Sequence, residues 1–350
     1  MKKLYILIIA LFAINVVNGQ SCLTNGITFT TQAQIDNFQT NYPNCTQIEG
    51  NTKIKGSDIT NLNGLSVLTS IGGDLSIIFL DISSLTGLDN LTSVGGNLDI
   101  VGNDVLTNLT GLNNLTFIGM RTLIFYNSAL TSLFGMGNVT SIGGYLWIEG
   151  TSSLINLQGM EGLTSIGEGL CLNNNSELQS LSGLENVTSI GGSLYFSGND
   201  SLTDLKELNN IIAMSIDSLV IRNNGQLSSC ETQNICDYLA NPSGTIEIHD
   251  NAPGCNSQVE VEAACATMSV EPLTTNPVFT IYPNPASTKI TIESSSKGLM
   301  TFWTISGQEI LHQTITEQTT PIDIGSLPNG VYFVRLTVEK AVQVGKFVKN

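Results

Sequence analysis

The sequence predicts an all-β protein: a right-handed parallel β-solenoid of about 24-residue coils with helical caps, plus a C-terminal β-sandwich. Three observations predict this fold class. Aliphatic columns recur at one spacing through the middle of the chain, cysteines stand at both ends of that repeat, and the last part of the chain alternates apolar and polar residues. We expect a signal peptide at 1–19, the solenoid with disulfide-stapled caps at 20–265, a linker at 266–277 and the sandwich at 278–350.

The segment 1–19 is typical of a secretory signal peptide. Lys2 and Lys3 precede an apolar stretch over 4–13, and the small Gly19 allows cleavage before Gln20. The apolar stretch is too short to span a bilayer. We therefore expect a soluble, exported mature chain.

The middle of the chain is an internal repeat. A Gly-Leu pair or a close variant opens each unit, at a nearly constant interval along the chain. It starts at Gly64, Gly87, Gly111, Gly135, Gly159 and Gly183, with Glu207 in the seventh place. Four apolar columns keep the same spacing, and one of them runs Ile71, Val94, Ile118, Ile142, Ile166, Ile190, Met214. One period shared by four columns predicts an array of similar structural units.

Each unit holds three short apolar pieces separated by glycines and small polar residues, without helical spacing. Burial of about six aliphatic side chains stabilises a coil by on the order of 10 kcal/mol. Fixing the backbone of such a coil costs roughly 24–48 kcal/mol. A coil therefore cannot fold alone, and we expect the coils to stack through parallel strands. The polar side chains that follow one strand are expected to bond turn backbone; they are Asn103, Asn127, Asn199 and Asn223.

Both ends of the stack need a cover, because bare strand edges pair with other chains. Residues 30–42 and 229–241 are predicted to be capping helices, the second with Ser229 as its N-cap, and 245–251 a closing strand. Six cysteines in an exported chain are expected to be oxidised: Cys22, Cys45, Cys230, Cys236, Cys255 and Cys265. The last four allow three connectivities. A zinc site is the alternative for them, disfavoured because no CxxC pair is present, and Cys171 is left over.

Charge and composition exclude several function classes. The net charge is −16, and residues 20–275 hold 5 basic against 24 acidic side chains. We expect no duplex nucleic-acid partner, because contacts to its phosphate backbone require a basic face. With only two histidines, His249 and His312, a Ser/His/Asp site or a histidine-built metal site lacks its residues. We expect no metal and no cofactor.

One strand of the repeat carries an unusual outward column. We place Leu123 and Phe125 inward in the same way as Leu146 and Ile148, and alternation then points the residue between each pair outward. The column runs Lys53, Ser76, Asp99, Ile124, Trp147, Cys171, Tyr195, Val220, Glu247, with Tyr126 and Tyr145 adjoining. An apolar, aromatic patch of this kind is typical of a recognition surface. The predicted ligand-binding residues are Ile124, Tyr126, Tyr145, Trp147, Tyr195 and Val220.

Two other interpretations of this face stay open. Aromatic and β-branched residues also pair well across strands, and the C-terminal domain could pack here. Catalysis is disfavoured, because Asp99 is flanked in its column by Ser76 and Ile124 and lacks the second carboxylate that glycoside hydrolysis requires.

The opening CTQIEGNTKIKG (45–56), followed by units such as LTSIGGDLSI, resembles the receptor L-domain family of leucine-rich solenoids. The resemblance covers about residues 22–265 and implies the fold, whereas it indicates no ligand. A generic leucine-rich repeat is the alternative, disfavoured because no LxxLxLxxNxL run is kept.

The tail is predicted to be a separate sandwich with strands at 288–294, 299–305, 309–315 and 331–338 and turns at 306–308 and 329–330. FTIYPNPASTKITI (279–292), ISGQEI (305–310), LPNGVYFVRL (327–336) and GKFVKN (345–350) together resemble the type A C-terminal sorting domain of the type IX secretion system. The positions that match the family signature are Tyr282, Pro283, Asn284, Pro285, Gly330 and Lys346.

This resemblance implies the type IX secretion machinery as a partner, and a final location outside the cell or attached to the outer-membrane surface. We expect a noncatalytic, adhesin-like protein that binds an extracellular carbohydrate or protein through its aromatic strand face. The alternatives are a passive structural surface protein and, less favoured, a polysaccharide-acting β-helix enzyme.

Overall fold

The computed structural model describes residues 20–268, 279–294, 297–304, 309–338 and 341–350. The chain divides into two compact units, Met1–Ser269 and Val270–Asn350, and each is described by itself. The predicted signal peptide, the turn at 306–308 and most of the predicted linker lie outside the described residues.

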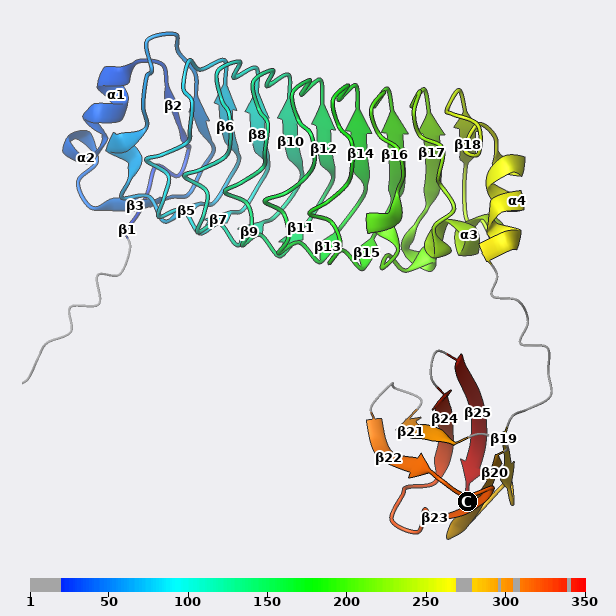
Figure 1. Cartoon of the computed structure of the whole chain (residues 1–350). Helices are drawn as coiled ribbons and strands as arrows, with labels where there is room; N and C mark the ends of the chain where they lie inside the picture. The colour runs from blue at the N-terminus through cyan, green and yellow to red at the C-terminus, as the bar shows by residue number, and fades with distance from the viewer. Residues whose placement is uncertain (1–19, 269–278, 295–296, 305–308, 339–340) are drawn as a thin grey trace, which may run out of the picture. The chain divides into compact units, whose positions relative to one another are not determined.

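The first unit is a solenoid in which each coil stacks on the one before it through parallel strands (Figure 1). The ten-stranded sheet contains, in spatial order, β18 (Ile246–His249), β17 (Ser218–Arg222), β16 (Ser193–Ser197), β14 (Leu170–Asn173), β12 (Leu146–Glu149), β10 (Thr122–Phe125), β8 (Leu98–Val101), β6 (Leu75–Ile78), β4 (Thr52–Ile54) and β2 (Ile27–Phe29). The eight-stranded sheet contains β1 (Gln20–Cys22), β3 (Cys45–Ile48), β5 (Ser70–Ile71), β7 (Ser93–Val94), β9 (Phe117–Ile118), β11 (Ser141–Ile142), β13 (Ser165–Ile166) and β15 (Ser189–Ile190). The mostly-β solenoid predicted from the sequence is confirmed.

The repeating aliphatic columns fill the interior between the two sheets, where Leu109, Leu133 and Leu157 are fully buried. The glycine column closes one corner of each coil. Gly135 has a φ of +122°, and a Cβ there would meet the main chain of Leu109 in the previous coil. Glycine therefore allows the backbones of successive coils to approach closely.

A ladder of buried asparagines runs along the corner that follows the ten-stranded sheet. Each side-chain oxygen accepts the main-chain N–H of the equivalent residue in the preceding coil, and its Nδ2 donates to a carbonyl of that coil. The asparagines of the ladder are Asn103, Asn127, Asn175, Asn199, Asn224 and Asn251. Thr151 interrupts the ladder, because its buried hydroxyl has no hydrogen-bond partner within the described residues. The predicted Asn223 lies one residue earlier, in the left-handed region with φ +55°. The ladder satisfies buried turn backbone, so it ties neighbouring coils together.

Short helices cover both ends of the solenoid (Figure 1). At the start, α1 (Gln32–Asp36) and α2 (Phe38–Asn41) occupy the predicted segment, and Thr31 and Gln34 form a capping box. At the far end, α3 (Gln233–Ala240) begins after Thr232, so the prediction of Ser229 as N-cap is wrong. The Ser229 hydroxyl donates to Glu231 instead.

A further helix, α4 (Gln258–Met268), packs against α3 and β18. It runs past the predicted domain end at residue 265, because its glutamate, alanine and methionine residues favour helix. Within the described residues, no helix is both long enough and apolar enough to cross a membrane.

The seventh coil departs from the repeat. Short 3-10 helices η2 (Lys206–Leu208) and η3 (Ala213–Ser215) replace its corner and its strand in the eight-stranded sheet; the first coil has a similar turn, η1 (Asn63–Leu65). Met214, expected in the buried aliphatic column, is 96 % exposed, and Ile216 is buried near its place. The eight-stranded sheet therefore ends at β15, and the Ser215 hydroxyl accepts the Ile190 N–H at its edge.

Three disulfides hold the ends of the solenoid, and they link Cys22 to Cys45, Cys230 to Cys255 and Cys236 to Cys265. The last two select one of the three connectivities that the sequence left open. The second joins the coil before α3 to the coil after it, and the third joins α3 to α4. Cys171 is free.

The second unit is a sandwich of two antiparallel sheets around a core of Ile290, Phe302, Val334 and Phe347. One sheet contains β19 (Phe279–Tyr282), β20 (Lys289–Ser294) and β23 (Thr319–Asp323), and the other β22 (Glu309–Ile315), β21 (Gly298–Thr304), β24 (Gly330–Val338) and β25 (Ala341–Lys349). The four predicted strands are present, and β19, β23 and β25 were not predicted as strands.

The asparagine ladder predicts a measurable stability cost for its loss. In Asn175→Ala, the Thr151 N–H and the Ile148 carbonyl lose the partners they have at 3.1 and 3.0 Å. The buried Thr151 N–H is left without a partner and the Ile148 carbonyl keeps only its place in the strand ladder, so the variant loses about 1–3 kcal/mol, to be read from urea unfolding followed by circular dichroism. The control is Gln179→Ala, at an exposed position of the same coil, which should change stability by less than about 0.5 kcal/mol. Equal effects would contradict a stabilising ladder.

Candidate functional site

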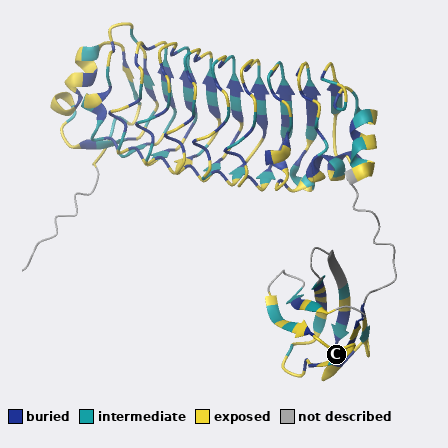
Figure 2. Ribbon diagram, viewed as in Figure 1, coloured by how far each residue is buried: buried dark blue, intermediate teal, exposed yellow. Residues whose placement is uncertain are grey.

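The candidate site is the outer face of the ten-stranded sheet, where strands alternate between buried and half-buried residues (Figure 2). Strand pairing aligns the residue between the two inward positions of each strand into a first outward column. It runs Lys53, Ser76, Asp99, Leu123, Trp147, Cys171, Tyr195, Val220, Glu247. The second outward column, two residues on, includes Val101, Phe125, Glu149, Asn173, Ser197 and Arg222.

The prediction that Ile124 lies on this face is wrong. Ile124 is fully buried and pairs in register with Ile148, whereas Leu123 points outward opposite Trp147. The buried polar Thr122 takes the interior place that a leucine holds in the adjacent coils, which hid the register in the sequence. The period could have revealed it, because Thr122 lies midway along the chain between Leu98 and Leu146 and so holds their place in the repeat.

The corrected register creates an aromatic pair that the sequence missed. Phe125 moves to the outer face and contacts Trp147 edge to face, with 5.2 Å between ring centres. Both rings are half-buried. The indole Nε1 of Trp147 is buried and has no hydrogen-bond partner within the described residues. Most buried tryptophan N–H groups have a hydrogen-bond partner, so the fold leaves this donor unsatisfied.

Two tyrosines lie over glycines of the next coil. Tyr126, 55 % exposed with φ +54°, covers Gly150, where an added Cβ would lie 2.5 Å from its ring. Tyr145 covers Gly169 in the same way, at 2.8 Å. The Tyr126 hydroxyl donates to Glu149 at 3.2 Å, and the charge of that carboxylate raises the pKa of Tyr126. Because each ring packs against a glycine of the next coil, both rings have defined positions on the face.

The far side of the face ends in a polar network. Tyr195 is half-buried, and its hydroxyl accepts a hydrogen bond of 2.6 Å from the guanidinium of Arg222. Arg222 also pairs with Glu247 at 3.6 Å. Val220 lies in the outward column but is only 9 % exposed, because its short side chain sits between the longer Tyr195 and Glu247 on adjacent strands. The prediction of Val220 as a contact residue is therefore weakened by its burial.

Cys171 lies in the first outward column between Trp147 and Tyr195. Burial raises the pKa of its thiol to about 11, and the charge of Glu149 acts in the same direction. The thiol is therefore neutral at ordinary pH and acts as a small apolar group between two rings.

Charged groups bound the face on its other side. Burial raises the pKa of Asp99, opposed by the guanidinium of Arg121, whose Nε lies 3.9 Å from the carboxylate. The charge of Asp74 also raises the pKa of Asp99. The Asp74 carboxylate itself accepts hydrogen bonds from the main-chain and side-chain N–H groups of Asn97. Among the described residues, no three His, Cys, Asp or Glu side chains are grouped so as to hold a metal.

The sorting signature lies in the second unit. The side chain of Asn284, which lies between Pro283 and Pro285, makes two hydrogen bonds to the main chain of β25. Its Oδ1 accepts the Val348 N–H at 2.9 Å, and its Nδ2 donates to the Lys346 carbonyl at 3.1 Å. Most of the signature is exposed, namely Tyr282, which is 44 % exposed, Pro283, Asn284, Pro285 and Lys346, whereas Gly330 is half-buried at the start of β24. The signature thus joins the segment after β19 to the last strand of the chain.

Comparison with protein families agrees with this geometry. Residues 280–350 match the secretion system C-terminal sorting domain, and six copies of the BspA type leucine-rich repeat region match over 81–203 and 116–241. The chain carries BspA-type leucine-rich repeats and a type IX sorting domain. No curated protein matches the chain.

The sorting domain indicates export through type IX secretion to the cell surface or outside the cell, and it implies contact with that secretion machinery. The leucine-rich solenoid followed by a sorting domain, as predicted from the sequence, is confirmed; the repeat that matches is the BspA type. Both families are non-catalytic domains. The protein is a secreted or surface repeat protein.

The environment of Cys171 predicts an unusual pH profile for its alkylation. At pH 8, a thiol with a pKa of about 11 is roughly 100-fold less ionised than one at the ordinary 9.0, and only the thiolate reacts. Iodoacetamide labelling, followed by mass spectrometry of the Cys171 peptide from pH 7 to 11.5, should rise with a midpoint near 11. The matched variant Glu149→Gln should move the midpoint to lower pH, because it removes a like charge. A midpoint near 9 in the parent would contradict the buried environment.

Proposed function

We propose that the protein is an exported, noncatalytic, adhesin-like protein of the cell surface or medium that recognises an extracellular carbohydrate or protein. The proposed contact surface, named here the aromatic face, consists of Phe125, Tyr126, Tyr145, Trp147 and Tyr195. The type IX secretion machinery exports the protein by recognising its sorting domain. The observation that carries the proposal is that these five rings stay partly exposed on one sheet face, although the aliphatic columns of the first six coils are buried.

The rigidity of the face supports a binding role. Main-chain pairing on both sides holds β10, β12 and β16 in register. The rings of Tyr126 and Tyr145 pack against glycines of the next coil, which sets the ring positions. A preorganised surface binds with less loss of conformational entropy than a flexible one. Large rings with little side-chain freedom are also the groups that dominate binding energy in many interfaces.

The chemistry of the face suits ligands with both apolar and polar parts. The rings of Trp147 and Phe125 offer apolar surface. The carboxylate of Glu149 and the guanidinium of Arg222 lie in the same outward column as Phe125, next to the column of Trp147. A sugar presents C–H groups on one side and hydroxyls at its edge, and a protein loop presents the same mixture. Both ligand classes therefore fit the same surface.

The two alternative functions make different demands. A passive structural surface protein needs no specific ligand, so its aromatic rings would serve cross-strand packing alone. A polysaccharide-acting enzyme needs two free carboxylates, whereas Asp74 is bonded to Asn97 and Asp99 pairs with Arg121. The noncatalytic binding function does not require a pair of free carboxylates.

The test compares binding by the parent and by the double variant Trp147→Ala/Tyr195→Ala on a glycan array and in pull-downs of extracellular proteins. We expect the double variant to bind its ligand about 10- to 100-fold more weakly, because central rings each contribute 1 kcal/mol or more, roughly, to binding. Phe117→Ala/Phe134→Ala is the matched control, because both phenylalanines are exposed on other parts of the solenoid. Equal loss in both double variants, or indifference to Trp147→Ala/Tyr195→Ala, would refute the aromatic face as the site, and no ligand at all would favour the passive surface protein.

A further inference from the structure

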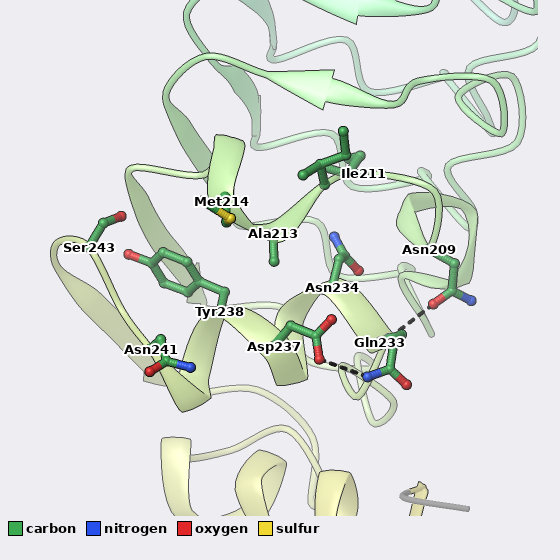
Figure 3. Close-up of a pocket in the computed structure, with 11 residues that line it drawn as sticks. Asn209, Ile211, Ala213, Met214, Gln233, Asn234, Asp237, Tyr238, Asn241 and Ser243 are labelled. Carbon is green, nitrogen blue, oxygen red and sulfur yellow. Dashed lines mark hydrogen bonds between the residues drawn. The ribbon is translucent and has the colours of Figure 1, made fainter. Parts of the chain in front are cut away.

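A second surface lies at the end of the solenoid, away from the aromatic face in sequence and in the fold. A hollow of about 710 Å³ opens between η3 of the seventh coil and helix α3 (Figure 3). It exists because the seventh coil has no strand in the eight-stranded sheet, so the backbone at 211–216 leaves the regular path.

The hollow has uncovered apolar side chains. Met214 is 96 % exposed and Ile212 is 59 % exposed, and both line it. The residues that hold the place of Met214 in earlier coils are buried, as Ile166 and Ile190 illustrate. Flexible, polarisable methionine surfaces adapt to apolar partners of different shape. The exposed pair therefore makes this part of the surface suited to an apolar group from another molecule.

A buried hydrogen-bond donor faces the same hollow without a partner. Asn234 is only 2 % exposed; its Oδ1 accepts the Thr232 hydroxyl at 2.6 Å, and its Nδ2 has no acceptor within the described residues. Figure 3 shows its side chain directed from α3 toward the segment of Ile211 and Ala213. A buried amide N–H without an acceptor costs about 1–3 kcal/mol. A carbonyl oxygen brought by a ligand would remove this cost.

The charge of the rim favours a cation. Asp237 is exposed at the edge of the hollow, where it accepts a bond from Gln233 at 2.8 Å, and no lysine or arginine is among the lining residues. The region 20–275 has 24 acidic against 5 basic residues. Anionic ligands are therefore repelled, and a basic group next to an apolar one is attracted.

We propose that this hollow binds an extended peptide segment of a partner protein in which apolar side chains are flanked by basic residues. An apolar side chain packs against Met214 and Ile212, a main-chain carbonyl accepts from Nδ2 of Asn234, and a lysine or arginine faces Asp237. An extended peptide supplies these three groups together, since side chains and carbonyls alternate along it. The volume is that of an ordinary ligand pocket. The site is independent of the aromatic face.

The test measures binding of a fluorescein-labelled peptide to the full-length chain by fluorescence anisotropy. The probe has three central leucines and three lysines at each end; one comparison peptide has glutamates for lysines, and another has serines for leucines. We expect only the first peptide to bind measurably. Met214→Asp should weaken it at least 10-fold, and Asn234→Asp, which replaces the donor by an acceptor of the same shape, about 2- to 10-fold.

Met120→Asp is the matched control, because Met120 is also an exposed methionine but lies outside the hollow. Both substitutions add a negative charge, which would strengthen a purely electrostatic attraction of the lysines. Weaker binding by Met214→Asp alone therefore supports apolar docking. Met214 is almost fully exposed, so its replacement leaves the fold intact, as circular dichroism can verify.

Three results would overturn the proposal. Binding of the glutamate or serine peptide as tight as that of the first peptide would exclude a basic, apolar segment as the ligand. Equal binding by Met214→Asp and Met120→Asp would exclude the hollow. Sedimentation of the parent as a dimer that both Met214→Asp and the first peptide dissociate would assign the hollow to a second copy of this chain.

Discussion

The hydrogen bonding of each coil to the next is the interaction on which the rest of the structure depends. A single coil of this protein buries too few aliphatic side chains to offset the entropy of its own backbone. Parallel strands, the buried asparagine ladder and the close approach of backbones at the glycine column all act between coils. Stability is therefore shared along the stack, and its two ends need helices and disulfides because one face of each terminal coil has no neighbour.

The same stacking gives the surface its properties. A residue that points outward in one coil lies beside its equivalent in the next, at about 4.8 Å. A few aromatic substitutions in neighbouring coils therefore form a continuous patch without any change in the core. Phe125 contacts Tyr126 of its own coil and Trp147 of the next coil, and glycines in the next coil leave room for the rings that lie over them. Recognition can thus change on the outer face while the interior columns stay the same.

The end of the repeat creates a different kind of surface. Where the seventh coil loses one strand, side chains that the pattern would bury become exposed, and α3 forms the opposite wall of a hollow. The sorting domain has its own core, and Asn284 is hydrogen-bonded to its last strand. The export signal and the surfaces of the solenoid therefore belong to separate units.

The sequence was enough to predict the period, the burial of the aliphatic columns, the caps and the sorting signature. Each of these features depends on residues that are close together in the chain or that repeat at a fixed interval. Ile124 was misplaced because its register depends on Thr122, a polar residue that only the stacked neighbours bury. The exposure of Met214 and the pairing of Cys236 with Cys265 likewise depend on how the last coil meets α3 and α4. Contacts between coils decided these features, and a one-dimensional pattern does not contain them.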